Sequence, residues 1–238
     1  MISLNNVTKT YRDGTSALQQ VTLMIETGEF VYLKGKSGSG KSTLLKVLYG
    51  QEKVNRGQVR LADHHVHKMN NRKIHKLRRE IGVVFQDYQL LSYKTVFDNI
   101  AYVLEVTGYP KEKINDKVIE ALEKVGLKHK IFEYPSNCSG GEQQRIAIAR
   151  AIVHDPIVLL ADEPTGNLDP QNAYSILKVL HKINKSGTTV IMATHDQSLV
   201  DKMPSRVIEL EKGYLTKDRS INHTMMILSS RMGEQYII

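Results

Sequence analysis

Two periodicities of apolar residues divide the chain into predicted strands and helices. Residues 2–8 and 21–25 alternate apolar and polar side chains, which is typical of half-exposed strands in an antiparallel sheet. Residues 30–33, 81–85 and 157–161 are continuous apolar runs bounded by turn residues. Runs of this kind are typical of buried strands, and the last one predicts the core of a parallel sheet.

Helical periodicity follows several of these strands. Residues 96–106 and 111–125 predict two helices separated by a Gly-Tyr-Pro break, and the second has an apolar face that lets the pair pack as a helical lobe. The other predicted elements are a strand at 57–61, helices at 142–154 and 170–184, a strand at 188–193, and a closing hairpin with strands at 207–210 and 214–216.

The element order predicts an α/β fold with a parallel sheet core, an antiparallel β-subdomain near the N-terminus and an inserted helical lobe. A length of 238 residues is enough for one large domain of this kind. Residues 221–238 have few breakers and an apolar cluster at 225–228. Both a docking helix and a frayed terminus fit this tail.

Composition narrows the class of protein. The chain is 41% hydrophobic and 24% charged, which is an ordinary balance for a globular protein. Its one cysteine, Cys138, excludes a disulfide within the chain and fits a reducing cytoplasm. We expect no secretory signal and no membrane span, because no apolar run approaches ~20 residues. The net charge of +8 fits nucleic acid, an anionic membrane or, most simply, a solvated surface.

Residues 35–42, GKSGSGKS, are the most specific motif in the chain. They match G-x-x-x-x-G-K-[ST] and lie between a predicted strand and a predicted helix. Glycines let backbone N–H groups surround phosphate oxygens, and the helix N-terminus adds partial positive charge. Lys41 would reach the β- and γ-phosphates, and the Ser42 hydroxyl would ligate Mg²⁺. The motif therefore predicts a nucleotide site.

Polar residues follow three of the predicted strands. Gln86 comes after the strand at 81–85, Asp162 and Glu163 follow the strand at 157–161, and His195 follows the strand at 188–193. Ligands bind at the carboxyl ends of such strands. We expect Asp162 to hold Mg²⁺ with Ser42. We expect Glu163 to accept a proton from, or orient, a water, and His195 to contact the γ-phosphate.

Four other features allow more than one interpretation. Tyr11 is either an adenine-stacking aromatic or a core residue. The histidine-rich residues 63–67 match no zinc spacing and favour a solvated turn. The basic residues 70–80 favour an exposed helix over contacts with phosphates of nucleic acid or lipid. The Ser-Gly-Gly turn at 139–141 opens a predicted helix and is a second candidate anion site.

Together these motifs resemble those of the ABC-type ATPases over residues 1–218. In that resemblance residues 35–42 correspond to the Walker A loop, residues 138–144 to the signature and residues 166–169 to the D-loop. Gln86 falls at the Q-loop, and His195 at the switch histidine. The chain departs from the family at Cys138, where leucine is usual, at Lys36, where related loops often have proline, and in the tail, which matches nothing in the family.

The resemblance implies a P-loop NTPase fold of the RecA type, ATP hydrolysis, and ATP and Mg²⁺ as cofactors. It assigns catalysis to Glu163, His195 and Lys41. It assigns metal binding to Ser42, Gln86 and Asp162. It assigns contacts with the nucleotide to Tyr11, Gly35, Ser37, Gly38, Ser39, Gly40, Lys41, Ser42, Thr43, Gln86, Ser139, Gly140, Gly141, Gln143, Asp162 and Asp169. One Walker A loop and one signature per chain imply a homodimer with two shared sites.

Within the family, residues 163–169 resemble the branch of lipoprotein-release, macrolide-export and cell-division ATPases. Residues 28–52 and 81–91 favour the cell-division members. These imply a peripheral position on the cytoplasmic side of the membrane, a transmembrane FtsX-like partner and, indirectly, cell-wall hydrolases. The partner would dock in a groove beside Asp87, Tyr88, Leu90 and Leu91.

We expect an ATPase domain at 1–220 with a helical insert at about 87–150, and a tail at 221–238. A transporter ATPase of the lipoprotein-release or macrolide type is the main alternative. A nucleic-acid-bound ABC protein and a scaffold that does not hydrolyse ATP are others. We expect no nucleic acid partner, because the chain has neither a long coiled-coil insertion nor a second cassette. Intact Glu163 and His195 argue against the scaffold.

Overall fold

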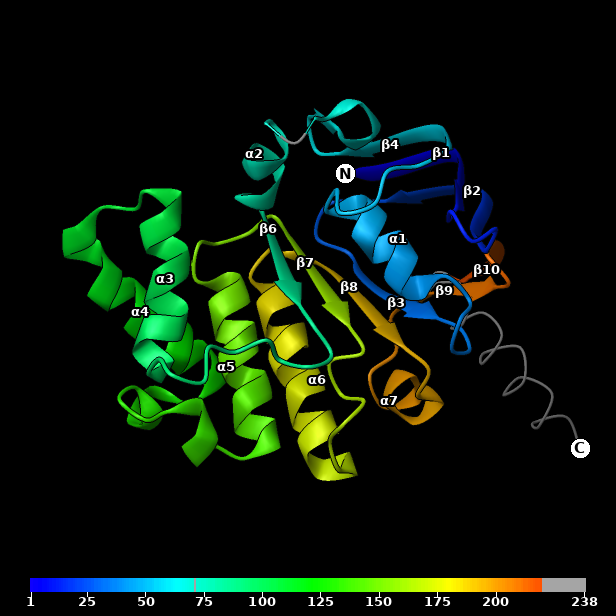
Figure 1. Cartoon of the computed structure of the whole chain (residues 1–238). Coiled ribbons are helices and arrows are strands. Elements are labelled where there is room, and N and C mark those ends of the chain that lie inside the picture. Colours follow the sequence, from blue (N-terminus) through cyan, green and yellow to red (C-terminus); the bar gives the residue numbers. More distant parts are fainter. Residues whose placement is uncertain (71, 220–238) are drawn as a thin grey trace, which may run out of the picture.

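The computed structural model describes residues 1–70 and 72–219, so the tail at 221–238, with its predicted docking helix, lies outside the described residues. Near the N-terminus four strands form an antiparallel sheet in the order β2-β1-β4-β5, which confirms the predicted β-subdomain (Figure 1). These strands are β1 (Ile2–Thr10), β2 (Ser16–Ile25), β4 (Arg56–Leu61) and β5 (His64–His65).

A second sheet has six strands in the order β10-β9-β3-β8-β7-β6. Its neighbours from β9 to β6 all pair in parallel, and β10 closes the edge as an antiparallel hairpin with β9. The prediction of a parallel core is therefore confirmed. The strands are β3 (Phe30–Lys34), β6 (Ile81–Val84), β7 (Val158–Asp162), β8 (Thr189–Thr194), β9 (Arg206–Glu211) and β10 (Tyr214–Arg219).

The pleat of β3 sends alternate side chains into two separate hydrophobic cores. Phe30 and Tyr32 pack among the helices on one face, whereas Val31 and Leu33 pack against α1 (Lys41–Leu48) and the antiparallel sheet on the other. Figure 1 shows α5 and α6 covering the first face and α1 lying on the second. Burial on both faces explains why this strand is continuously apolar.

The helical lobe consists of α3 (Val96–Thr107) and α4 (Lys111–Val125), and both pack against α5 (Gly140–Ile152). Thr95 and Asp98 form a capping box at the start of α3, and glycines in the left-handed conformation end both lobe helices. The bounds of α4 agree with the prediction, and its predicted apolar face is buried. This lobe confirms the predicted inserted helical subdomain.

Two predicted helices have different bounds in the structure. Within the described residues of the basic stretch at 70–80, only the five of α2 (Ile74–Arg78) are helical, and the N-cap of α2, Lys73, makes no side-chain capping bond. The helix predicted at 142–154 begins earlier, at Gly140, because Ser139 caps it. The remaining helices are α6 (Pro170–Lys185), near its predicted bounds, and α7 (Gln197–Lys202), which the sequence pattern did not predict.

His181 on α6 supports a prediction about stability at acid pH. Its ring stacks on Phe30 with 3.9 Å between ring centroids, and its Nε2 lies 3.2 Å from the Tyr32 hydroxyl. Burial lowers the pKa of His181 from 6.5 to about 4. The unfolded chain therefore binds a proton that the native chain does not, and the free energy of unfolding falls as the pH drops through this window.

On acidification, we expect the free energy of unfolding of His181→Gln to fall by about 1 kcal/mol less than that of the native chain. This figure is smaller than the full pKa shift implies, because the His181 ring is partly exposed to solvent. Urea unfolding of both proteins at pH 7 and across the window from 6.5 to 4 measures it. Other titrating groups are common to the two proteins and cancel in the comparison. Parallel pH dependences for the two would contradict the prediction.

Candidate functional site

The glycine-rich loop between β3 and α1 needs its glycines for space as well as for conformation. A Cβ on Gly35 would lie 2.3 Å from Ser39 Oγ and 2.4 Å from the Leu210 carbonyl oxygen. Gly40 has φ 108, and a Cβ there would lie 2.3 Å from the Ala17 carbonyl oxygen. Gly38 also has positive φ. The loop therefore curls tightly at the N-terminus of α1, as a phosphate-binding loop requires.

Lys41 is the first residue of α1 and is only 4% exposed. Its Nζ donates to the carbonyl oxygens of Gly35 at 2.8 Å and Lys36 at 3.2 Å, and lies 3.3 Å from Glu163 Oε1. The ammonium thus folds back over the loop that precedes it. It therefore lies beside the loop whose backbone N–H groups would bind a phosphate chain.

The side chains of Ser42, on α1, and Asp162, at the end of β7, are in contact, although the two residues are 120 positions apart in the chain. The Ser42 hydroxyl donates to Asp162 Oδ1 at 3.1 Å, and Asp162 is the last residue of β7. Burial raises the pKa of Asp162, and the nearby Glu163 carboxylate adds to this effect. A hydroxyl and a partly buried carboxylate are the hard oxygen donors that Mg²⁺ prefers, so this pair fits the predicted metal.

Glu163 connects Lys41 to His195. Its Oε2 lies 3.2 Å from His195 Nδ1, while its Oε1 faces the Lys41 ammonium. The backbone of Glu163 has φ 45, and its N–H donates to the Ala193 carbonyl at 3.1 Å. A left-handed glutamate is an uncommon conformation that typically occurs where function demands it. His195 follows β8 and is 62% exposed at the open side of the site.

A cavity of about 800 Å³ joins these groups, and its size is within the range of small-molecule sites. Residues from five parts of the chain line it. The predicted site residues among them are Tyr11, Ser37, Gly38, Gly40, Lys41, Ser42, Thr43, Gln86, Glu163 and His195. Tyr11 bonds to Thr43 through its hydroxyl at 3.2 Å. The structure therefore gathers residues of the Walker A loop, Gln86 of the Q-loop, Glu163 directly after β7 and the switch histidine His195 around one space.

Four further residues line the same cavity without having been predicted: Thr15, Ser16, Ala17 and Lys36. The first three lie at the start of β2 and in the turn before it, and the Ala17 carbonyl packs on Gly40. No motif marks them in the sequence, because their place depends on the antiparallel sheet folding over the P-loop. Lys36 lies inside the motif at a position that the motif leaves open.

The signature residues lie elsewhere on the surface. Among the described residues that line the cavity, none comes from Ser139–Gln143, and Asp169 is also absent. Ser139 caps α5 in a capping box with Glu142, and Asp169 caps α6. A Cβ on Gly141 would lie 2.7 Å from Asn172 Oδ1, so the starts of α5 and α6 are packed together. These residues therefore do not line the P-loop cavity of their own chain.

Cys138, the departure from the family pattern, is 7% exposed, as expected for a small buried hydrophobe. Burial raises the pKa of its thiol, which disfavours the reactive thiolate.

The histidine-rich residues 63–67 take part in hydrogen bonds within the protein. His64 Nε2 lies 2.9 Å from Glu80 Oε1, and His67 Nδ1 accepts from the Val59 N–H at 3.1 Å.

Arg150 holds the Q-loop, the turn that follows Gln86, against α5, the helix that begins in the signature residues. Tyr88 and Gln89 have φ 58 and φ 50, so two consecutive residues are left-handed. Arg150, on α5, donates to the carbonyl oxygens of Gln89 at 2.6 Å and Tyr88 at 2.9 Å. The Tyr88 hydroxyl in turn lies beside Gly140, where a Cβ would be 3.2 Å away. The strained turn just after Gln86 is thus in contact with both the start and the end of α5.

We expect Arg150→Ala to release this turn. Losing two charge-assisted hydrogen bonds should lower the free energy of unfolding by about 1–3 kcal/mol and reduce ATP turnover, because Gln86 loses its fixed neighbour. Chemical denaturation and steady-state ATPase assays measure both effects. Arg150→Lys keeps the charge and should recover part of each. Wild-type stability and turnover in Arg150→Ala would contradict this role.

No helix in residues 1–70 and 72–219 is long and apolar enough to cross a membrane. A sequence model of the ABC transporter family matches residues 18–166. The chain is 52% identical over 219 residues to the cell division ATP-binding protein FtsE of Mycobacterium tuberculosis, covering 92% of this chain and 95% of the relative. It is 49% identical over 220 residues to FtsE of Streptococcus pneumoniae, covering 92% and 96%.

Among solved structures, the dimeric bacterial ABC transporter cassette MJ0796 superposes with a TM-score of 0.84 at 36% identity. The match covers 93% of this chain and 99% of the cassette. Both the predicted resemblance to ABC-type ATPases and the predicted fold are thereby confirmed. The chain belongs to the ABC transporter family and is one of its ATP-hydrolysing, nucleotide-binding proteins.

Proposed function

We propose that the chain is the ATPase of a cell-division complex, in which two copies close over two ATP molecules and act on a transmembrane FtsX-like partner. The observation that carries the ATPase part is the cluster in which Glu163 contacts both Lys41 and His195 beside the P-loop. The cell-division part is supported by the relatives, which are named as cell division ATP-binding proteins.

In this proposal the P-loop amides and Lys41 bind the β- and γ-phosphates. The Lys41 ammonium stabilises negative charge that develops on the phosphate oxygens during transfer. Glu163 accepts a proton from the attacking water, for which its position between Lys41 and His195 suits it. His195, exposed at the cavity edge, contacts the γ-phosphate. Tyr11 stacks on the adenine at the far end of the cavity.

Mg²⁺ neutralises phosphate charge when it is bound. Ser42, Asp162 and Gln86 would hold it. Support for this set comes from the Ser42–Asp162 contact and from the burial that makes an unpaired Asp162 carboxylate unfavourable. A divalent cation would compensate that buried charge. Gln86 lines the same cavity and starts the strained Q-loop turn.

We infer that Ser139, Gly140, Gly141 and Gln143 bind the nucleotide held by a second copy. Two facts support the inference. These residues lie at a helix N-terminus suited to anions, and they do not line the cavity of their own chain. Asp169 caps α6 next to this segment and would couple the two sites. The dimeric architecture of the MJ0796 cassette is consistent with the same arrangement.

The partner would dock in a second groove, of about 810 Å³, between the C-terminal part of α1 and the edge strand β6. Phe85, Gln86 and Asp87 line it together with Gln89 and Tyr49. Of the residues predicted beside this groove, Asp87 lines it, whereas Leu90 packs partly against the helical core. Because Gln86 belongs to both cavities, a partner seated here would sense the state of the nucleotide.

In this arrangement the chain is peripheral on the cytoplasmic side of the membrane, and ATP-driven closure regulates cell-wall hydrolases on the far side. Residues 1–220 form the ATPase domain with its helical insert at about 87–150, and residues 221–238 are a separate tail.

The test is purification of tagged chain from native membranes in mild detergent, followed by identification of the membrane protein that copurifies. A small division protein with a large external loop supports the proposal. A permease with lipoprotein-release or macrolide-export accessories would move the chain to transport and leave the ATPase assignment intact. Absence of any membrane partner would overturn the membrane role.

A further inference from the structure

A large share of the positive charge is concentrated in one short segment beside the partner groove. Residues 60–80 contain seven Lys or Arg and two acidic residues, so 21 residues carry +5 of the net charge of +8. All seven cations are exposed, but Arg60 pairs with Asp63 and Arg78 donates to backbone carbonyls. The other five form what we call the basic rim. The basic rim consists of Lys68, Arg72, Lys73, Lys76 and Arg79.

Neither acid of the segment neutralises the basic rim. Asp63 lies 3.6 Å from Arg60, and Glu80 lies 2.9 Å from His64. Within residues 1–70 and 72–219, no rim side chain takes part in an ion pair. On α4, by contrast, the half-buried Lys117 and Lys124 are both paired with carboxylates, Lys124 with Glu120 at 2.8 Å. The basic rim therefore keeps its full charge for an external anion.

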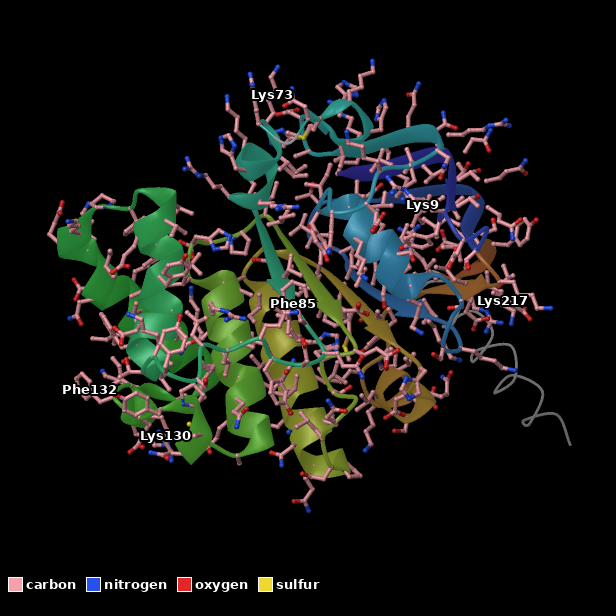
Figure 2. The ribbon with its side chains drawn as sticks, in the orientation of Figure 1. Lys9, Lys73, Phe85, Lys130, Phe132 and Lys217 are labelled. Atoms are coloured by element: carbon pink, nitrogen blue, oxygen red, sulfur yellow. The ribbon has the colours of Figure 1, made fainter. Side chains whose placement is uncertain are left out.

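Contacts with the end of α1 hold α2, which carries part of the basic rim, beside the groove. Leu77 of α2 is fully buried, and Ile74 packs on Gly50 at the end of α1. Arg78 donates to the carbonyl oxygens of Tyr49 at 3.3 Å and Gly50 at 3.5 Å, and it also lines the groove. Leu77 and Ile74 thus lie on the inner side of α2, whereas the rim residues Lys73, Lys76 and Arg79 are exposed. Figure 2 shows Lys73 at the outer edge of the molecule, beyond Phe85 in the groove.

We propose that the basic rim binds the anionic headgroups of membrane phospholipids. The proposal rests on the proposed function, because a groove that receives a transmembrane protein places its rim next to the bilayer. A cluster of four to eight Lys or Arg at that position is attracted to acidic lipids, each residue adding to the affinity. The basic rim would orient the ATPase on the membrane and help to present the groove to the partner.

The residues themselves favour lipid over nucleic acid. Residues 60–80 contain no Phe, Tyr or Trp, and of their four histidines His64 and His67 are engaged in hydrogen bonds within the protein, so they offer little surface on which bases stack. The helix α2 has only five residues, too few to follow a DNA groove as recognition helices do. What remains is a set of long cationic side chains without a shaped pocket. Such a set suits mobile phosphate headgroups, which need charge and not a fixed geometry.

The test is co-sedimentation of the full chain with vesicles of phosphatidylcholine, either alone or mixed equally with phosphatidylglycerol. One variant replaces all five rim residues by glutamine. The matched control makes the same charge change on α4 and α6, far from α2 in Figure 1, at Lys111, Lys113, Lys178, Lys182 and Lys185. ATPase activity in solution should be the same in all three proteins, which shows that each is folded.

We expect the native chain and the control to bind the anionic vesicles and to be released by high salt. The rim variant should bind at least ~10-fold more weakly. The proposal would be overturned if the rim variant bound the anionic vesicles as tightly as the native chain, or if the control lost as much affinity as the rim variant. It would also be overturned if the native chain bound vesicles equally well with and without phosphatidylglycerol. So would binding of duplex DNA through the rim in preference to the vesicles.

Membrane purification separates this outcome from the proposed function. Vesicle binding through the basic rim without a copurifying membrane protein would support lipid binding and overturn the proposed transmembrane partner. A copurifying membrane protein without vesicle binding would support the partner and overturn lipid binding by the basic rim.

Discussion

Glu163→Gln will keep ATP bound and almost stop its hydrolysis. The glutamine amide cannot accept a proton from water at neutral pH, and loss of a general base typically costs 10²- to 10⁴-fold in rate. We therefore expect turnover to fall at least ~100-fold. ATP should still bind, because the P-loop and Lys41 are untouched and the amide of glutamine occupies the same space. With hydrolysis blocked, the ATP-bound dimer should accumulate.

Steady-state phosphate release measures the first effect, and size-exclusion chromatography with and without ATP measures the second. Glu112→Gln is a matched control, since Glu112 is exposed on α4 in the helical lobe. It should change neither result. Turnover in Glu163→Gln near the native value would remove Glu163 from the role of general base. A monomer in the presence of ATP would contradict the shared-site dimer.

Lys41→Ala will lose most of its affinity for ATP. The Lys41 side chain is almost fully buried, so bulk water cannot replace the contacts that its ammonium makes. A charge-assisted hydrogen bond contributes about 1.5–3 kcal/mol. That is about 10- to 150-fold in the dissociation constant. The substitution also leaves Glu163 without its cation, which adds repulsion toward the phosphates.

Equilibrium binding of a fluorescent ATP analogue measures this loss. Lys36→Ala is the comparison, because Lys36 lines the same cavity but its side chain is exposed and only its backbone carbonyl contacts Lys41. Its affinity should change less than ~3-fold, as for a surface charge. Equal losses in the two variants would show that the loop's overall charge, and not the position of Lys41, governs binding.

Several parts of the fold follow from short-range pattern. The helix α4 agrees with its predicted bounds because its apolar period, its break at Gly108–Pro110 and its glycine stop all lie within one stretch of chain. The strands β3, β7 and β8 were recognisable because strands buried on both faces are apolar throughout. The convergence of Asp162, Glu163 and His195 followed from one rule, that parallel strands end at the same edge of a sheet.

Other features depend on contacts between distant segments. The basic segment becomes only a five-residue helix, because α2 lacks a side-chain cap and is held by Leu77 and Ile74 against α1. Arg150 reaches the carbonyls of Tyr88 and Gln89 from about sixty residues away. Thr15, Ser16 and Ala17 line the nucleotide cavity because one sheet folds over the other.

The sequence by itself determined the chemistry of this protein: the P-loop, the carboxylates at the strand ends and the family to which they belong. These are local, because a motif carries its own backbone conformation and its own charges. Only the tertiary structure decided how Glu163 lies between Lys41 and His195 and that the signature residues do not line the P-loop cavity of their own chain. It also placed α2, with its cations, beside the groove that Arg78 lines. Those relations arise from packing two cores against one sheet, and no short stretch of sequence encodes that arrangement.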